Sequence, residues 1–351
     1  PAVRPPAENR CPARWSCTGS ERVCPACRKL EELRAEYLAV ACLAEARELR
    51  EAGVLTPILL LGYTPTDCAE ELLHYGLTQT VYDLESARAF SAAAQAAGRR
   101  LRIHVKADTG MSRLGWLCDE GHRTEAADAI AAVCALPGLE VEGIYTHFAN
   151  ADGDEAYTMG QFTRFLELLS ELEGRGITFP IRHCAASAAV LKYPCTHLDM
   201  VRPGVALYGH YPDPSCEGLD GVGLRPVMAL KTRVASVKAV PAGTPVSYGC
   251  THVLERDAEL AALTVGYADG LPRLCSDQLE VLIRGQRAPI VGRVCMDMCM
   301  ADATGLGAAP GDEVELFGEH LPVEGAAALA GTIQYELLCA VSPRVPREYL
   351  N

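Results

Sequence analysis

Lysine is scarce in this chain of 351 residues, which contains five lysines and 27 arginines. Chemistry that depends on a lysine amine therefore has few candidates, and these are Lys29, Lys106, Lys192, Lys231 and Lys238. Long hydrophobic runs are absent too, since no stretch approaches the ~20 apolar residues that span a bilayer. The N-terminus also lacks the apolar segment of a secretory signal peptide, so we expect no membrane association.

Positive charge is in deficit as well. The 45 acidic residues exceed the 32 basic ones, which gives a formal net charge of −13. Because general affinity for nucleic acid or anionic membranes needs a basic surface, this balance argues against both kinds of partner. The 16 cysteines are scattered along the chain, which is typical of reduced thiols in a cytoplasmic protein.

The sequence does contain enough apolar material for a sizeable core. Hydrophobic residues make up 49% and charged residues 22% of the chain, as in ordinary globular proteins. At about 150 residues per domain, this length predicts one large or two ordinary domains. Near residue 221 the sequence pattern changes from alternating apolar runs and helical stretches to strand-like runs. We therefore predict an atypical segment over 1–37, a barrel domain over 38–220 and a second domain over 221–351.

The first half alternates short apolar runs with amphipathic helical stretches, of which residues 154–173 are the longest. Repeated strand and helix units predict an α/β fold with a parallel sheet, and their number suits a β/α barrel at least as well as a doubly wound sheet. The expected strands are Pro57–Gly62, Thr78–Tyr82, Leu101–Lys106, Val141–Thr146, Ile181–Cys184 and Met200–Val201.

The second half reads as a mainly β domain, because strand-like runs alternate with turn signals. A single helix over Val323–Leu338 is expected to close it. The expected strands are Lys231–Val240, Glu259–Val265, Glu280–Ile283, Ile290–Met300 and Glu313–Phe317.

The first 29 residues match neither of these two sequence patterns. Cys24 and Cys27 have the spacing of half a zinc knuckle, but Cys11 and Cys17 are poorly spaced to complete it. We therefore predict no metal site, and interpret the segment as disordered or out of context.

Polar residues follow several of the expected barrel strands. In a parallel β/α barrel the carboxyl ends of the strands meet on one face, where such folds place their active sites. Two arginines, a serine and glycine-rich backbone in such a place form a natural receptor for a phosphate and a carboxylate; ordinary loop residues are the alternative. The residues concerned are Lys106, Asp108, Arg113, Tyr145, His147, His183, Ser187, Arg202 and Gly204.

The second domain adds one candidate for acid-base chemistry. Tyr248 lies between a serine and a glycine at a turn, where an exposed phenol could exchange a proton or merely cover a sheet edge. Met296 and Met300 read by default as core.

Eight long motifs, in this order, make the chain resemble the alanine racemases. They lie between about Leu38 and Arg347 and read AVACLAEARELREAG, HVKADTGMSRLG, YTHFANAD, MVRPGVALYG, VSYGCTH, VGYADG, APIVGRVCMDM and TIQYELLC. The resemblance implies an N-terminal (β/α) TIM-like barrel, a C-terminal mainly β domain and the cofactor pyridoxal 5′-phosphate.

The resemblance also implies residue roles around the cofactor. Arg202 would face the pyridine nitrogen, supported by His147; an arginine only donates hydrogen bonds, so that nitrogen would stay unprotonated. The phosphate ligands would be Ser187, the backbone of Gly204 and Val205, and Tyr335. A tyrosine at 335 favours alanine over serine as substrate.

Further roles concern the substrate. By the resemblance, Arg113 would bind its carboxylate, oriented by Lys106, with a backbone contact from Met296. Tyr248 would be a catalytic base that reaches the site from the partner subunit of a head-to-tail homodimer. Residues of the narrow substrate entrance would be Tyr267, Arg273, Arg293 and Asp152.

The family pattern fails at one place. Relatives hold the cofactor through a lysine in a motif like VVKANAYGHG, which also serves as the second base. The aligned residues here, Trp15–Arg22, read WSCTGSER and contain no lysine, and the opening barrel strand is absent as well. A frameshifted, truncated or misassembled start and a natural, non-catalytic protein are the two explanations.

We therefore predict a cytoplasmic alanine racemase by descent, which makes D-alanine for peptidoglycan but is inactive or severely impaired in this form. A serine or broad-specificity racemase and a non-catalytic pyridoxal-phosphate-binding protein remain the alternatives.

Overall fold

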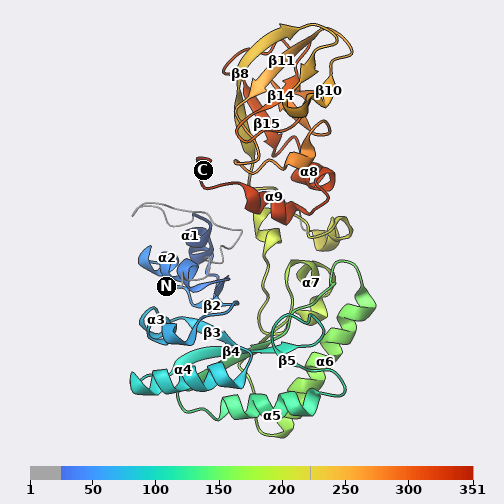
Figure 1. Cartoon of the computed structure of the whole chain (residues 1–351). Coiled ribbons are helices and arrows are strands. Elements are labelled where there is room, and N and C mark those ends of the chain that lie inside the picture. Colours follow the sequence, from blue (N-terminus) through green and yellow to red (C-terminus); the bar gives the residue numbers. More distant parts are fainter. Residues whose placement is uncertain (1–24, 222, 351) are drawn as a thin grey trace. The chain divides into compact units, whose positions relative to one another are not determined.

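The computed structural model describes residues 25–221 and 223–350, which form two compact units that meet in sequence at Leu224 and Arg225 (Figure 1). The predictions about the first strand, Trp15–Arg22, Cys11, Cys17 and Cys24 concern residues outside this part of the chain. Within it, no helix is both long and apolar enough to cross a membrane.

A parallel sheet forms the first unit, with strands in the order β1-β2-β3-β4-β6-β7 and β5 paired beside β4. The strands are β1 (Leu38–Val40), β2 (Ile58–Leu60), β3 (Thr78–Val81), β4 (Leu101–Asp108), β5 (Trp116–Leu117), β6 (Leu139–Tyr145) and β7 (Ile181–His183). Because neighbouring strands are parallel and separated by helices, the predicted α/β fold with a parallel sheet is confirmed, in the form of a half-barrel.

Helices alternate with these strands, and α4, α5 and α6 lie side by side along one side of the sheet (Figure 1). Their bounds are α1 (Pro25–Glu32), α2 (Leu43–Glu51), α3 (Ala69–His74), α4 (Leu84–Ala96), α5 (Arg123–Cys134), α6 (Glu155–Gly174) and α7 (Ser187–Lys192). Short 3-10 turns are η1 (Thr66–Cys68), η2 (Pro194–Thr196), η3 (Val205–Tyr208), η4 (Pro214–Cys216) and η5 (Leu219–Gly221).

Local sequence explains where the long helices begin. Asp154 caps α6 by accepting a hydrogen bond from the Tyr157 amide, and Asp83 caps α4 in the same way from Ser86. The apolar face of α6 then buries Phe165 and Leu168 in the core against the sheet.

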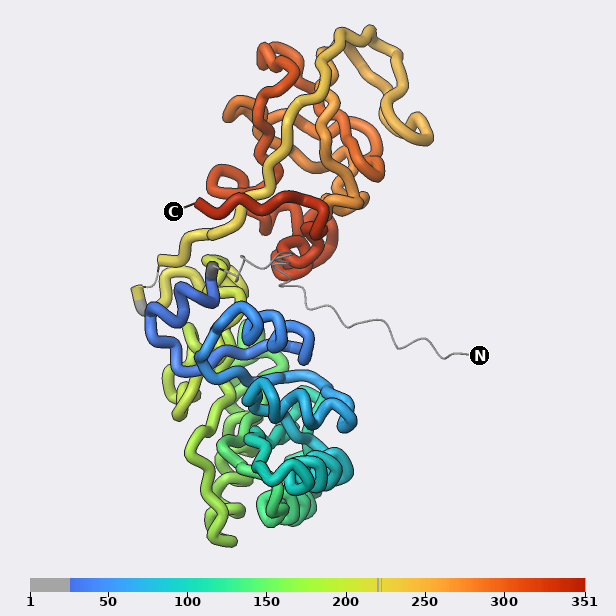
Figure 2. Tube along the Cα trace, turned by 90° about the vertical axis from the view of Figure 1, so that its left-hand side faces the viewer, coloured from blue at the N-terminus to red at the C-terminus, as the bar shows by residue number. Residues whose placement is uncertain are grey.

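An antiparallel sheet in the order β13-β12-β15-β8-β11-β14 forms the second unit, as the prediction of a mainly β domain requires. Its strands are β8 (Leu230–Val240), β11 (Ala258–Leu263), β12 (Glu280–Ile283), β13 (Gln286–Pro289), β14 (Cys299–Asp302) and β15 (Glu313–Phe317), with β9 (Pro245–Val246) and β10 (His252–Val253) as a separate pair. Figure 2 follows this unit from yellow to red and the first from blue to green. The remaining elements are η6 (Tyr248–Cys250), η7 (Arg273–Cys275), α8 (Val323–Leu329) and α9 (Gln334–Ala340).

Three predicted elements were wrong. Met200–Val201 is no strand; the neighbouring Arg202 makes an isolated bridge to Ala186. Within 290–300 only the last two residues belong to a strand, β14, while Ile290 forms a single bridge. The closing helix is two helices, since Gly331 between them adopts a left-handed backbone (φ +67°) that ends α8.

Candidate functional site

The ring of Tyr145, at the carboxyl end of β6, organises a cationic cluster in the first unit. His183 stacks on it with ring centroids 4.6 Å apart and an interplanar angle of 10°. Arg202 places its Cζ 5.0 Å from the ring centroid, and Lys106 its Nζ 5.3 Å from the same centroid. These four residues, predicted from strand ends, are brought together because β4, β6 and β7 are parallel neighbours.

Arg202 is held entirely by neutral acceptors among the described residues. Its Nη1 donates to Nδ1 of His183 at 2.5 Å, and its Nη2 lies 3.2 Å from Nδ1 of His147. The same Nη2 donates to the carbonyls of Thr146 (2.9 Å) and Cys184 (3.2 Å). A guanidinium carries five N–H donors, and Nε–H makes no hydrogen bond within the described chain. Arg202 therefore keeps donor capacity for a ligand.

Burial and neighbouring cations keep the imidazoles of this cluster neutral. Desolvation, together with the charges of Arg202 and Arg113, lowers the pKa of His147 to about 3. Desolvation, with Arg202 beside it, also lowers the pKa of His183 well below its ordinary value. For Lys106, burial lowers the pKa to about 8, although nearby Asp108 opposes the shift.

A second polar corner lies where α7 begins. The Ser187 Oγ accepts hydrogen bonds from the amides of Gly204 (2.8 Å) and Ala206 (3.3 Å). Because both contacts use oxygen lone pairs, the Ser187 hydroxyl hydrogen remains available to donate. Val205, the first residue of η3, lies in the same turn.

Asp108 shapes the loop that carries Arg113. Its Oδ1 accepts hydrogen bonds from the amides of Gly110 (3.0 Å), Met111 (2.9 Å) and Ser112 (3.1 Å). Arg113 contributes to the low pKa values of both His147 and Lys106, so the structure brings it to the same cluster. Asp152 is exposed, and its carbonyl accepts a hydrogen bond from Lys192.

In the second unit, Tyr248 lies on a conformationally unusual turn, with its side chain 72% exposed. Ser247 before it has a φ of +64° and Gly249 after it a φ of +76°. The positive φ at 249 favours glycine, and an added Cβ would lie 2.9 Å from Nη1 at the flexible end of Arg293. The Ser247 hydroxyl donates to the Arg293 carbonyl at 2.7 Å, which joins the turn to the 293 loop.

Other predicted residues of this unit lie on neighbouring loops. The Tyr267 amide donates to the Cys295 carbonyl, and the Ala268 amide to the Met296 carbonyl, each at 3.0 Å. Met296, predicted as core by default, is instead 54% exposed. Arg273 lies in η7 and Tyr335 at the start of α9, both with exposed side chains.

Sequence reasoning missed the residues behind the cluster. His104, Glu142 and Tyr37 lie beyond His183, and Ala206 completes the Ser187 corner. Strand alternation could have suggested His104, because it precedes Lys106 by two residues and so shares its face of β4.

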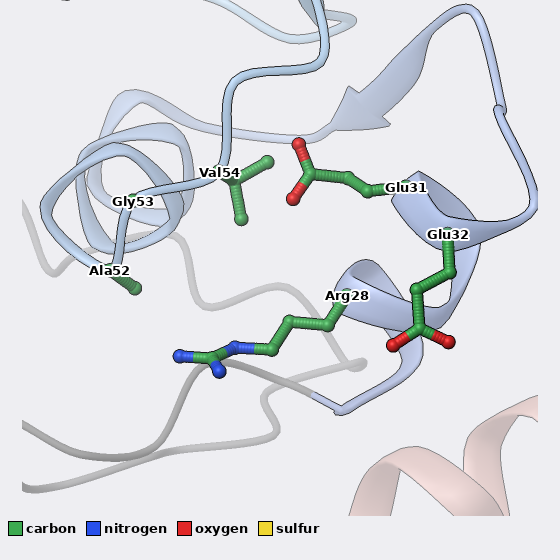
Figure 3. A pocket seen from close by; sticks show the side chains of 6 residues that line it. All are labelled: Arg28, Glu31, Glu32, Ala52, Gly53 and Val54. Carbon is green, nitrogen blue, oxygen red and sulfur yellow. The ribbon is translucent and has the colours of Figure 1, made fainter.

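A shallow depression lies away from this cluster, between α1 and the turn after α2 (Figure 3). Arg28, Glu31 and Glu32 line one side and residues 52–54 the other. Glu31 is already committed, since its Oε1 accepts hydrogen bonds from the Leu55 and Thr56 amides. No group of three or more potential metal-ligating side chains occurs in the part of the chain that the structure describes.

Family models match almost the whole chain. The model "Alanine racemase, N-terminal domain" matches residues 20–212, and "Alanine racemase, C-terminal domain" matches residues 227–349. The alanine racemase of Desulforamulus reducens is 50% identical over 330 residues, which cover 93% of this chain and 88% of the relative. That of Methanococcus maripaludis is 45% identical and covers 90% of this chain and 85% of its own length.

Solved structures agree with the sequences. The alanine racemase of Clostridium difficile 630 matches with a TM-score of 0.87 and 38% identity, covering 93% of this chain and 84% of that one. The alanine racemase of Bacillus anthracis with bound L-Ala-P matches with a TM-score of 0.83 and 35% identity, over 90% of this chain and 82% of that one. This chain belongs to the alanine racemase family.

Proposed function

We propose that this chain binds pyridoxal 5′-phosphate and is, by descent, an alanine racemase, an enzyme that interconverts L-alanine and D-alanine. The observation that carries the proposal is the hydrogen bonding of Arg202, whose guanidinium is held by neutral histidines and carbonyls and keeps an Nε–H donor unused within the described chain. Such a group fits an unprotonated pyridine nitrogen, because it can only donate.

The Ser187 corner fits the phosphate of the same cofactor. One hydroxyl hydrogen remains to donate, and the turn over Gly204 and Val205 supplies backbone close by. When bound, the cofactor supplies an electron sink for the α-carbon of an amino acid. Tyr335 is proposed as a further phosphate ligand.

Residues of this chain would then bind and reprotonate the substrate. We propose that Arg113 binds its carboxylate, with Lys106 orienting Arg113 and Met296 contributing a backbone contact. The exposed phenol of Tyr248 is proposed to move the proton on one face of the α-carbon, from the partner subunit of a homodimer with shared sites. Tyr267, Arg273, Arg293 and Asp152 would restrict the entrance to small substrates. D-alanine for peptidoglycan, made in the cytoplasm, is the proposed product, and we propose that this chain forms it slowly or not at all.

The lysines limit the activity that these residues can support. Lys29 pairs with Glu32 at the surface, Lys192 donates to the Asp152 carbonyl, and Lys231 and Lys238 belong to β8. Lys106 is the lysine at the cluster, where its Nζ donates to the Ala107 carbonyl at 2.6 Å. A non-catalytic pyridoxal-phosphate-binding protein is therefore the second candidate function.

Titration of the purified chain with pyridoxal 5′-phosphate, followed by absorbance, tests the binding. We expect saturable binding that R202E abolishes, whereas the surface variant R47E leaves it intact. Incubation with L-alanine and chromatographic separation of the enantiomers then decides between the candidates. D-alanine formed at an enzymatic rate favours the racemase, binding without D-alanine favours the binding protein, and no binding refutes both.

A further inference from the structure

A line of hydrogen bonds continues from Arg202 through the interior of the first unit. Arg202 Nη1 contacts His183 Nδ1 at 2.5 Å, and His183 Nε2 contacts His104 Nδ1 at 2.8 Å. His104 Nε2 lies 3.3 Å from Oε2 of Glu142. Both imidazoles are fully buried, so these contacts are not exchanged with water.

The position of every proton along this line follows from its first member. Because a guanidinium only donates, His183 must accept at Nδ1 and carry its proton on Nε2. His104 must then accept at Nδ1 and carry its own proton on Nε2. A positively charged His104 would turn a second donor toward His183 Nε2–H, so both rings must be neutral, and the line must end on an acceptor. Glu142 supplies that acceptor as a carboxylate.

The register of β4 and β6 leaves space for the His104 imidazole in this line of hydrogen bonds. The register between β4 and β6 shifts between Ile103 and His104, which sets His104 opposite Gly143. A Cβ at 143 would lie 2.8 Å from Cε1 of His104 and 2.8 Å from the Ile181 carbonyl. Only glycine therefore leaves space for the imidazole.

The far end of the line holds Glu142 as an anion. Its Oε2 also accepts a 2.5 Å hydrogen bond from the Tyr37 hydroxyl, which in turn lies 2.7 Å from Oγ1 of the buried Thr78. The hydrogen bond from His104, followed by that from Tyr37, lowers the pKa of Glu142 despite its partial burial.

We propose that Glu142 is a positioning residue for Arg202, which fixes both histidines in the Nε2–H form so that the guanidinium is held by a neutral acceptor. The inference rests on the proposed role of Arg202 as the ligand of the cofactor's ring nitrogen. Its consequence is a separation of charge: the nearest anion on the line stands two imidazoles away, so the positive charge of Arg202 is not cancelled by a direct ion pair. A carboxylate in place of His183 would form a direct ion pair with Arg202 and neutralise its charge.

Nitrogen NMR of the histidine rings in the cofactor-free protein tests the tautomers directly. We expect His104 and His183, identified by the loss of signals in H104N and H183N, to show protonated Nε2 and unprotonated Nδ1 at neutral pH. A proton on Nδ1 of either ring, or a charged ring, would overturn the proposal.

Two variants of Glu142 separate its charge from its acceptor. E142Q keeps a carbonyl oxygen for His104 and Tyr37, so both Nε2–H forms should persist. E142L removes the acceptor, so a second ring form of His104 should appear. E140L, on an exposed position of the same strand, is the matched control and should leave all histidine signals unchanged. Unchanged tautomers in folded E142L would refute the role of Glu142.

The guanidinium itself reports whether the effect reaches Arg202. In the parent and in E140L we expect slowly exchanging Nη hydrogens of Arg202, identified by comparison with R202K, and at least tenfold faster exchange in E142L. Tautomers that change while this exchange rate does not would reject Arg202 as the target. Both readouts need no cofactor, so failure to bind pyridoxal 5′-phosphate would overturn the proposed function without touching this result.

Discussion

Arg202 differs from a surface arginine in the number and kind of its partners. It donates to two imidazoles and two carbonyls, whereas Arg47 makes a single ion pair with Glu71 and is 45% exposed. A lysine ammonium cannot reproduce the planar fork of a guanidinium. Replacing either arginine with lysine keeps the charge. Any difference between the effects of the two substitutions on stability therefore follows from hydrogen-bond geometry.

We predict that R202K lowers the free energy of unfolding by about 2–4 kcal/mol, because at least one of several charged hydrogen bonds worth about 1.5–3 kcal/mol each is lost. R47K, the matched control, should change it by less than about 1 kcal/mol. Urea unfolding followed by circular dichroism measures both. Equal effects of the two variants would show that the fork geometry of Arg202 contributes little.

The lowered pKa of His147 predicts a pH dependence of stability. His147 has its pKa lowered to about 3 in the folded state, against about 6.5 in an unfolded chain. The folded state thus binds fewer protons than the unfolded state. The contribution of neutral His147 to the free energy of unfolding is therefore full above pH ~6.5 and is lost as the pH falls toward 3, with a slope of up to about 1.4 kcal/mol per pH unit.

Urea unfolding between pH 7.5 and 5 measures this slope. We expect H147N to reduce it, because the variant has no group to titrate, and the exposed H74N to leave it unchanged. A slope in H147N equal to that of the parent would mean that His147 is readily protonated in the folded protein.

At the scale of elements, the pairing of β4 with β6 determines what the site contains. The register shift at His104 turns its imidazole toward the interior, and the parallel alignment then sets Lys106 opposite Tyr145. A sequence pattern predicts that strands end near these residues, but it does not fix register, which depends on packing between strands. This is why Arg202 and His147 could be predicted from motifs, whereas the line through His104 to Glu142 could not.

The register predicts the effect of a single methyl group. G143A would place a Cβ within 2.8 Å of both His104 and the Ile181 backbone, and overpacking of this kind costs about 1–3 kcal/mol. We expect that loss in urea unfolding, together with shifted ring signals of His104. G160A on α6, where an added Cβ meets nothing within 4 Å, is the control and should be neutral or stabilising. A neutral G143A would show that the strands adjust without moving His104.

At the scale of the whole molecule, composition and motif order predict the fold class because they report on many residues at once. Alternating strands and helices indicate a parallel sheet wherever individual boundaries fall. Single-residue backbone geometry is less accessible: the break between α8 and α9 depends on Gly331 adopting a positive φ. Likewise, the 54% exposure of Met296 depends on a loop pairing that its apolar type does not indicate.

The five lysines lead to a prediction for the chain as a whole. Formation of a covalent bond to the aldehyde of pyridoxal 5′-phosphate needs an unprotonated amine next to the bound cofactor. Among the lysines in the described part of the first unit, only Lys106 lies at the Arg202 cluster. Its side chain is buried, donates to the Ala107 carbonyl and lies beside Tyr145. We therefore expect non-covalent binding of the cofactor, with little or no racemisation. Borohydride reduction of the loaded chain followed by intact-mass measurement should leave its mass unchanged. A stoichiometric pyridoxyl adduct, mapped by peptide mass and lost in K106R but retained in the surface control K29R, would instead make Lys106 the covalent anchor and contradict the expected impairment.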